Sequence, residues 1–113
     1  MSLEEITRNY LQAFQNRDIE TLSKFFSETV ELRDWELYAE GKKNVIKANQ
    51  GIFDAFSVIT VEITNIISKK NQVAVEFRLI LSEDGSEVSI LVTDIIEFDE
   101  RFQISRLRAY RGN

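Results

Sequence analysis

An α+β fold, with three helices packed on one face of a strongly curved antiparallel sheet, is predicted by three features of the sequence. Apolar residues recur at helical spacing in the first half of the chain, they alternate with polar residues over long segments after residue 57, and turn-forming residues separate these segments. The chain has 113 residues, 43% of them hydrophobic and none of them cysteine, so we expect one domain over residues 1–113 that closes its own core.

The first expected helix covers residues 3–14. Its apolar stripe consists of Leu3, Ile6, Tyr10, Ala13 and Phe14. Ser2 and Glu5 have the spacing of a capping box, in which each side chain satisfies a backbone donor at the start of a helix. Asp18 can cap a second, shorter helix. The inner face of that helix would consist of Ile19, Leu22, Phe25 and Phe26.

A period of two replaces the helical spacing at Thr29, which predicts a strand over residues 29–35 with Val30, Leu32 and Asp34 on one face. Gly41 then breaks the chain. Helical spacing returns over residues 45–56, which predicts a third helix.

Four longer strands, linked by hairpins, are expected over residues 58–67, 73–81, 88–98 and 102–110. The last of them changes phase, because Phe102 and Ile104 share one parity while Leu107 and Ala109 share the other. A β-bulge near Ser105 would reconcile the two halves.

The composition excludes several classes of function. Fourteen basic and nineteen acidic residues give a net charge of −5, which repels nucleic acid. The chain has no histidine and no cysteine, so a Ser-His-Asp triad, a Cys-His pair and a histidine-ligated metal are excluded. We expect no cofactor. The acidic start and the lack of a long apolar run predict a soluble cytoplasmic protein with no membrane partner.

Asp94 interrupts an otherwise apolar face. In the strand over residues 88–98 it lies between Val92 and Ile96, which share its parity. Desolvation would raise the pKa of this carboxyl group and favour the neutral acid, which can donate a hydrogen bond. The alternative is that a neighbouring group satisfies the carboxyl group and that it has no further role.

Three other polar residues share inward-facing positions. Asp34 ends the first strand on the face of Val30 and Leu32, although an exposed turn residue is the more common interpretation. Tyr10 lies on the stripe of the first helix, where a phenol is more often part of the core. Asn49 lies on the inner stripe of the third helix, where it either faces a pocket or bonds to nearby backbone.

Two further groups of residues, one of arginines and one of aromatic residues, each allow two interpretations. Arg106, Arg108 and Arg111 resemble a substrate clamp, but an arginine ladder on the solvent side of an edge strand is the more common arrangement. Trp35 and Tyr38 would either cover the mouth of a pocket or contribute to a dimer face.

These elements together resemble a known family. The helical hairpin, the strand ending VELRD at residues 30–34, the helix after Gly41 and the closing ISRLRAY at residues 104–110 are similar to the nuclear transport factor two-like superfamily. The nearest similarity is to its SnoaL-like and ketosteroid-isomerase-like branch. That resemblance implies a cone-shaped α+β barrel with a deep apolar pocket, in a homodimer.

The resemblance also implies roles for residues. In ketosteroid isomerases a tyrosine and a neutral aspartic acid hydrogen-bond the substrate oxygen while a second aspartate moves the proton. Tyr10, Asp94 and Asp34 fall at the matching positions. The family usually has a proline after this last aspartate, whereas this chain has Trp35.

The first functional hypothesis is therefore an isomerase, or a related lyase or cyclase, that removes a proton next to a carbonyl group of an apolar ketone or steroid-like substrate. Asn49, Trp35, Phe53 and Phe56 are the expected contacts to this apolar small-molecule ligand. A non-catalytic binding module and a dimeric interaction domain are the alternatives. An epoxide hydrolase with an Asp-Arg-Asp set is disfavoured, because its central arginine would be Arg78, which shares the parity of Glu76.

Overall fold

The structure is a computed structural model that describes residues 1–112. Its helices are α1 (Leu3–Gln15), α2 (Ile19–Ser23) and α3 (Lys42–Ala55). Its strands are β1 (Phe26–Arg33), β2 (Tyr38–Glu40), β3 (Val58–Lys69), β4 (Gln72–Glu83), β5 (Ser86–Phe98) and β6 (Ile104–Arg111). None of the helices within residues 1–112 has the length and apolar character to cross a membrane.

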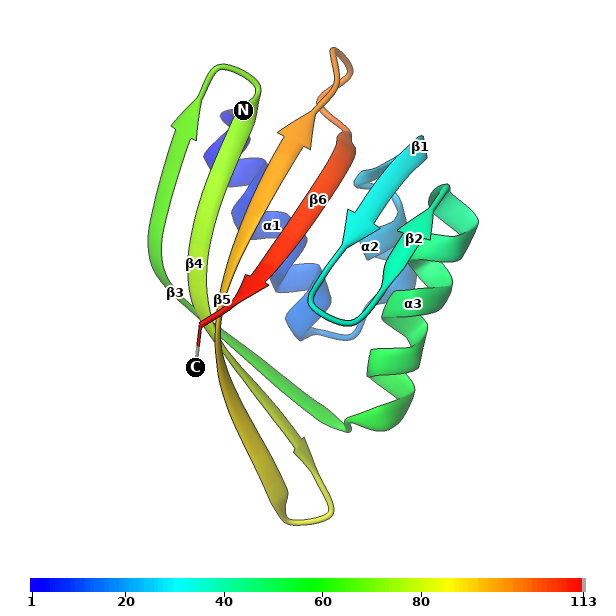
Figure 1. Ribbon diagram of the computed structural model, residues 1–113, viewed down its shortest axis with the longest axis vertical. Coiled ribbons are helices and arrows are strands. Elements are labelled where there is room, and N and C mark those ends of the chain that lie inside the picture. Colours follow the sequence, from blue (N-terminus) through cyan, green and yellow to red (C-terminus); the bar gives the residue numbers. More distant parts are fainter. Residues whose placement is uncertain (113) are drawn as a thin grey trace.

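The six strands form one curved, unclosed sheet in the order β2-β1-β6-β5-β4-β3. Figure 1 shows α1 behind the long strands and α3 beside β1 and β2. The core fills the space between these helices and the sheet, where α1 packs on β3 and α3 packs on β1. This arrangement confirms the predicted α+β class.

One strand pair differs from the expected antiparallel pattern. β1 pairs with β6 in parallel, while every other neighbouring pair within the described sheet is antiparallel. The four later strands are joined by hairpins, which force antiparallel pairing, but β1 reaches its neighbour β6 through most of the chain. The long connection therefore allows β1 to run parallel to β6.

Both predicted N-terminal caps are present. The Ser2 side chain accepts a hydrogen bond from the backbone of Glu5 at 3.1 Å, and Asp18 accepts one from the backbone of Thr21 at 3.1 Å. The second helix is shorter than predicted, because Phe26 is the first residue of β1 instead of a helical residue. The Phe25 carbonyl accepts a bond from the Ile104 amide at 2.7 Å, so pairing with the sheet replaces helix continuation.

The short strand β2 was not predicted. Its three residues are too few to show alternation, and their burial pattern is mostly exposed. Before the next helix, Gly41 adopts a φ of 86°, a conformation that favours glycine, and its amide donates to the Val30 carbonyl at 2.8 Å.

The predicted bulge in the last strand is confirmed. Glu97 faces Arg106 and Phe98 faces Ile104, so Ser105 is the extra residue of β6. The Ser105 hydroxyl donates to the Glu97 carbonyl at 3.1 Å. The predicted start of this strand at Phe102 is wrong, since residues 99–102 form a turn in which Phe102 has a φ of 62°.

Candidate functional site

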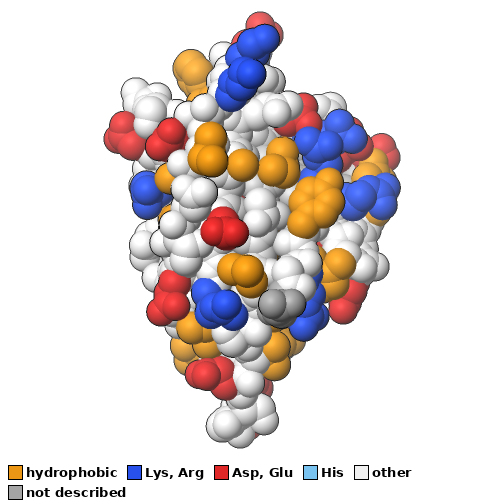
Figure 2. All heavy atoms as spheres, turned by 60° about the vertical axis from the view of Figure 1, so that its left-hand side comes forward, with side chains coloured by type: hydrophobic (Ala, Val, Ile, Leu, Met, Phe, Trp, Pro, Cys, Tyr) orange, Lys and Arg blue, Asp and Glu red, His pale blue; other side chains and the backbone are white. Residues whose placement is uncertain are grey.

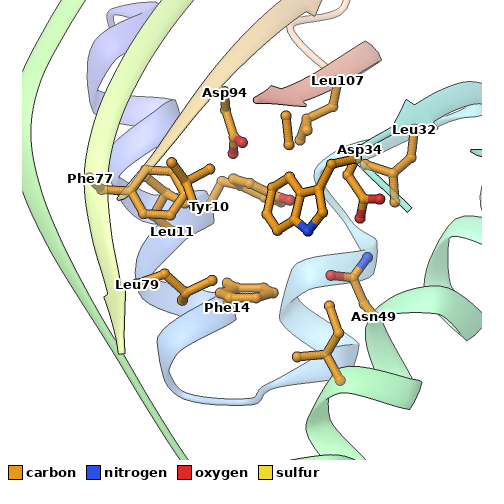
Figure 3. Close-up of a pocket in the computed structure, with 14 residues that line it drawn as sticks. Tyr10, Leu11, Phe14, Leu32, Asp34, Asn49, Phe77, Leu79, Asp94 and Leu107 are labelled. Carbon is orange, nitrogen blue, oxygen red and sulfur yellow. The ribbon is translucent and has the colours of Figure 1, made fainter. Parts of the chain in front are cut away.

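A cavity of about 90 Å³ lies between α1, α3 and the inner face of the sheet. Figure 3 shows its lining, which is mostly apolar, with Leu11, Phe77 and Leu107 among the labelled side chains. Its polar members are Tyr10, Asp34, Asn49 and Asp94. The four inward-facing polar residues of the sequence therefore meet in one pocket.

Asp94 occupies the wall formed by β5. The side chain is 5% exposed, and Val92 and Ile96 on the same face are also buried, so the inward direction predicted from the pattern is confirmed. Burial raises the pKa of Asp94 to about 7, and the negative charge of Asp34 adds to the rise. Below a pH of about 7, Asp94 is therefore mostly the neutral acid, whose O–H group can donate a hydrogen bond.

Tyr10 approaches the same space from α1. Its ring packs edge-on against Phe25 and Phe26, with centroid distances of 5.9 and 5.8 Å. Burial raises the pKa of the Tyr10 hydroxyl, and the charge of Asp94 adds to the rise. The phenol consequently keeps its proton over the physiological range and remains a hydrogen-bond donor.

Asp34 has two roles in the geometry at once. Its Oδ1 accepts bonds from the amides of Glu36 at 2.7 Å and Leu37 at 2.8 Å, which is the turn chemistry expected of a strand end. The side chain also lines the pocket. Both turn bonds use Oδ1, so they hold the carboxylate in place while Oδ2 takes no part in them.

Asn49 is 5% exposed and lines the pocket from α3. Its amide nitrogen donates to the Val45 carbonyl at 2.9 Å, so both sequence interpretations of this residue hold. Figure 3 shows its amide directed toward the Asp34 carboxylate.

Phe53 and Phe56, also expected to contact the ligand, do not line the cavity. Phe53 lies in the core, with its ring 5.6 Å from that of Phe14. Ile52 lines the cavity instead. It follows Asn49 by three positions, the spacing that puts two residues on one helix face, and this signal could have identified it from the sequence.

Trp35 lines the cavity and is 40% exposed, so it lies at the boundary between the pocket and solvent. The sequence interpretation of this residue as cover for a pocket mouth agrees with this position. Arg78 is outside the cavity, and its Nη1 donates to the Ser89 hydroxyl at 3.1 Å. The Asp-Arg-Asp arrangement of an epoxide hydrolase therefore lacks its arginine.

Within the described chain, no cluster of three or more acidic, histidine or cysteine side chains is placed to hold a metal ion. The pocket instead combines two buried O–H donors, on Tyr10 and Asp94, with the carboxylate of Asp34. Two donors can stabilise a developing oxyanion, and a carboxylate near them can accept a proton.

Comparison with known proteins identifies the family of this sequence. The family model for the SnoaL-like domain matches residues 7–107. No curated protein matches the chain.

Three solved structures have the same fold. A candidate SnoaL-like polyketide cyclase from Shewanella denitrificans OS-217 superposes with a TM-score of 0.88 at 15% identity, over 97% of this chain and 90% of its own. A protein of the nuclear transport factor 2-like class and unknown function, from Cytophaga hutchinsonii ATCC 33406, has a TM-score of 0.79 at 19% identity, over 98% and 100%. A candidate polyketide cyclase from Sinorhizobium meliloti has a TM-score of 0.78 at 19% identity, over 93% of each chain.

Proposed function

This chain belongs to the SnoaL-like domain family of the nuclear transport factor 2-like superfamily, and on that premise we propose that its pocket binds a small carbonyl compound and removes a proton next to the carbonyl group. The enzyme would be an isomerase, or a related lyase or cyclase. The observation that carries the proposal is the buried Asp94, whose pKa is raised to about 7. A neutral acid in an apolar pocket is suited to donate to an oxyanion.

The mechanism assigns opposite protonation states to the two aspartates. As Asp34 takes a proton from carbon, negative charge develops on the carbonyl oxygen, and Tyr10 and Asp94 donate hydrogen bonds to it. Tyr10 and Asp94 are each 5% exposed, whereas Asp34 is only half-buried. The wetter position suits an ionised base, and the drier position suits the neutral donor.

The size of the cavity narrows the substrate class. Pockets for drug-sized ligands usually measure about 300–1,000 Å³, whereas this cavity measures about 90 Å³. In this conformation the pocket accommodates the reactive end of a ligand, but not a steroid nucleus. A bulkier apolar ketone requires Trp35 to move from the mouth.

The test uses proton exchange because it requires no knowledge of the natural substrate. A panel of small enolisable ketones is incubated in D₂O with the protein, and the loss of the α-proton signal is followed by NMR. We expect Asp34→Asn to slow exchange by about 10²–10⁴-fold, the usual contribution of a general base, and to keep ligand binding.

Asp99→Asn is the matched control. Asp99 is also a turn aspartate whose Oδ1 accepts two backbone bonds, from Arg101 at 2.9 Å and Gln103 at 3.0 Å, but it does not line the pocket. Equal exchange rates in wild type and Asp34→Asn would reject Asp34 as the base.

A non-catalytic binding module is the second candidate, and the turn bonds of Asp34 favour it. A carboxylate that already accepts bonds from Glu36 and Leu37 has a structural reason to be present. This candidate predicts that ketones bind, as seen in shifts of pocket resonances, and dissociate with their α-protons unexchanged.

We also propose that the protein forms a homodimer through the outer face of the sheet. Figure 2 shows hydrophobic side chains interspersed with charged ones on this side of the molecule. Leu91 and Ile95 on β5 are half-buried there, and Ile67 on β3 is 59% exposed. Light scattering after size-exclusion chromatography tests the proposal, and a monomer mass at all concentrations would reject it.

A further inference from the structure

A second hollow, of about 310 Å³, adjoins the mouth of the pocket. Asp34, Trp35 and Ala109 line both spaces. The hollow is therefore the space into which a ligand would extend if its reactive end occupied the pocket.

Arginines dominate the remainder of this lining. Arg33 contributes from the end of β1, and Arg108 and Arg111 contribute from the end of β6, against the single carboxylate of Asp34. Positive charge is concentrated here on a protein whose net charge is −5.

The parallel pairing of β1 and β6 explains why these arginines meet. Arg33 lies beside Arg108 in the register of the two strands. Since parallel strands end at the same edge of a sheet, residues 75 positions apart in the sequence converge at the pocket mouth. Arg111 lies two residues beyond Ala109 on β6. Ala109 is the pocket residue that pairs with Asp94 between β5 and β6.

The arginines near the hollow differ in whether they form ion pairs. Arg106 and Arg108 contact the Glu97 carboxylate at 3.7 and 3.4 Å, as in a ladder on the outer face, although β6 lies inside the sheet and not at its edge. Among residues 1–112, Arg33 and Arg111 form no ion pair, and Arg33 lies 4.5 Å from the centre of the Tyr38 ring. Within this part of the chain, the guanidinium groups of Arg33 and Arg111 at the hollow therefore have no carboxylate partner.

We propose that the hollow lined by Arg33, Arg108 and Arg111 binds a carboxylate on the far end of the ligand, so that the substrate is a keto acid. This inference rests on the proposed function of the pocket. A guanidinium group binds a carboxylate through two parallel hydrogen bonds. A singly charged carboxylate meets less repulsion from Asp34 in the same lining than a doubly charged phosphate would.

The test compares 4-oxooctanoate with its methyl ester, which lacks the negative charge and carries one additional methyl group. Dissociation constants are measured by NMR titration for wild type, Arg111→Gln and Arg33→Gln. We expect wild type to bind the acid about tenfold more tightly than the ester, and each substitution to weaken binding of the acid more than binding of the ester, so that most of this difference is lost.

Arg101→Gln is the control for net charge. Arg101 is an exposed residue of the 99–102 turn and lines neither space, so the preference for the acid should persist in this variant. Equal binding of acid and ester to wild type overturns the carboxylate site and leaves the pocket proposal intact. Binding of neither probe overturns both, and an acid preference that survives both arginine substitutions overturns the assignment to these residues.

Discussion

Two carboxylates of β5, three residues apart, have opposite surroundings. Asp94 points into the pocket, where it is 5% exposed, and its pKa is raised to about 7 by burial and by the charge of Asp34. Glu97 points to the outer face, where Arg108 and Arg106 approach its Oε2 at 3.4 and 3.7 Å. The pleat of a single strand therefore separates a buried carboxyl group with a raised pKa from a carboxyl group that is paired with two arginines.

The difference teaches that position on the strand, more than residue type, decides what an acidic side chain can do. Among residues 1–112 no cation forms an ion pair with Asp94, and its raised pKa favours the protonated form that can donate a hydrogen bond to a ligand. On the outer face, Glu97 is instead paired with Arg106 and Arg108. Substitutions of Asp94 and Glu97 should therefore change the free energy of unfolding by different amounts. These changes should also depend differently on pH and salt.

The largest effect on stability is expected for Asp94→Asn. The folded-state pKa is raised from 3.8 to about 7, so the folded protein holds a proton that the unfolded chain releases, and stability falls as pH rises through this window. Asparagine removes that loss, which should be on the order of 4 kcal/mol by pH 8 at about 1.4 kcal/mol per pKa unit. Urea unfolding from pH 5 to 8 should show about 3 kcal/mol of it, the part that falls between pH 5 and the folded-state pKa of about 7.

The wild-type free energy of unfolding should fall relative to that of Asp94→Asn across this range. Glu97→Gln is the control on the opposite face and should follow the wild-type pH dependence. Parallel curves for wild type and Asp94→Asn would mean that Asp94 is not a desolvated acid.

A smaller effect, confined to activity, is expected for Tyr10→Phe. Neither cause of the raised Tyr10 pKa is a hydrogen bond, so loss of the hydroxyl should change the free energy of unfolding by less than about 0.5 kcal/mol. Loss of one oxyanion donor should slow α-proton exchange by about 10²-fold. A variant that exchanges at the wild-type rate would leave Tyr10 as a core residue only.

The smallest effect is expected for Glu97→Gln on the outer face. Its ion pairs involve side chains that are 23–48% exposed, so the substitution should reduce the free energy of unfolding by at most about 1 kcal/mol. The loss should shrink at high salt, because exposed charges are screened. A larger loss that persists at high salt would contradict this prediction, because it would show that the ion pairs of Glu97 are shielded from solvent.

Much of this fold is predictable from local pattern. Alternation predicts the long hairpins, and the spacing of Ser2 and Glu5 and the position of Asp18 predict the two helix starts. The parallel β1–β6 pair is different, because a strand direction set by a long connection leaves no mark in local periodicity. The three-residue β2 is too short to have a period.

The candidate site also has one part that local pattern predicts and one part that it does not predict. Polar residues on apolar faces identify Tyr10, Asp34, Asn49 and Asp94 as pocket members, since a face is a local property of a helix or strand. The sequence offers Arg108 and Arg111 for a substrate clamp as one of two interpretations, but the approach of Arg33 to them could not be predicted, because it depends on the register between β1 and β6. Arg33 lines the hollow because β1 and β6 pair in this register, and no single segment of the sequence shows that pairing.

The extra residue at Ser105 affects how this chain must be aligned with its relatives. Beyond it, Leu107 and Ala109 line the pocket, while Arg106 and Arg108 reach Glu97 outside. A relative without this bulge has one residue fewer before the same wall positions, so an ungapped alignment would match its pocket residues to Arg106 and Arg108. Transfer of substrate preference between such homologues requires a gap at this serine.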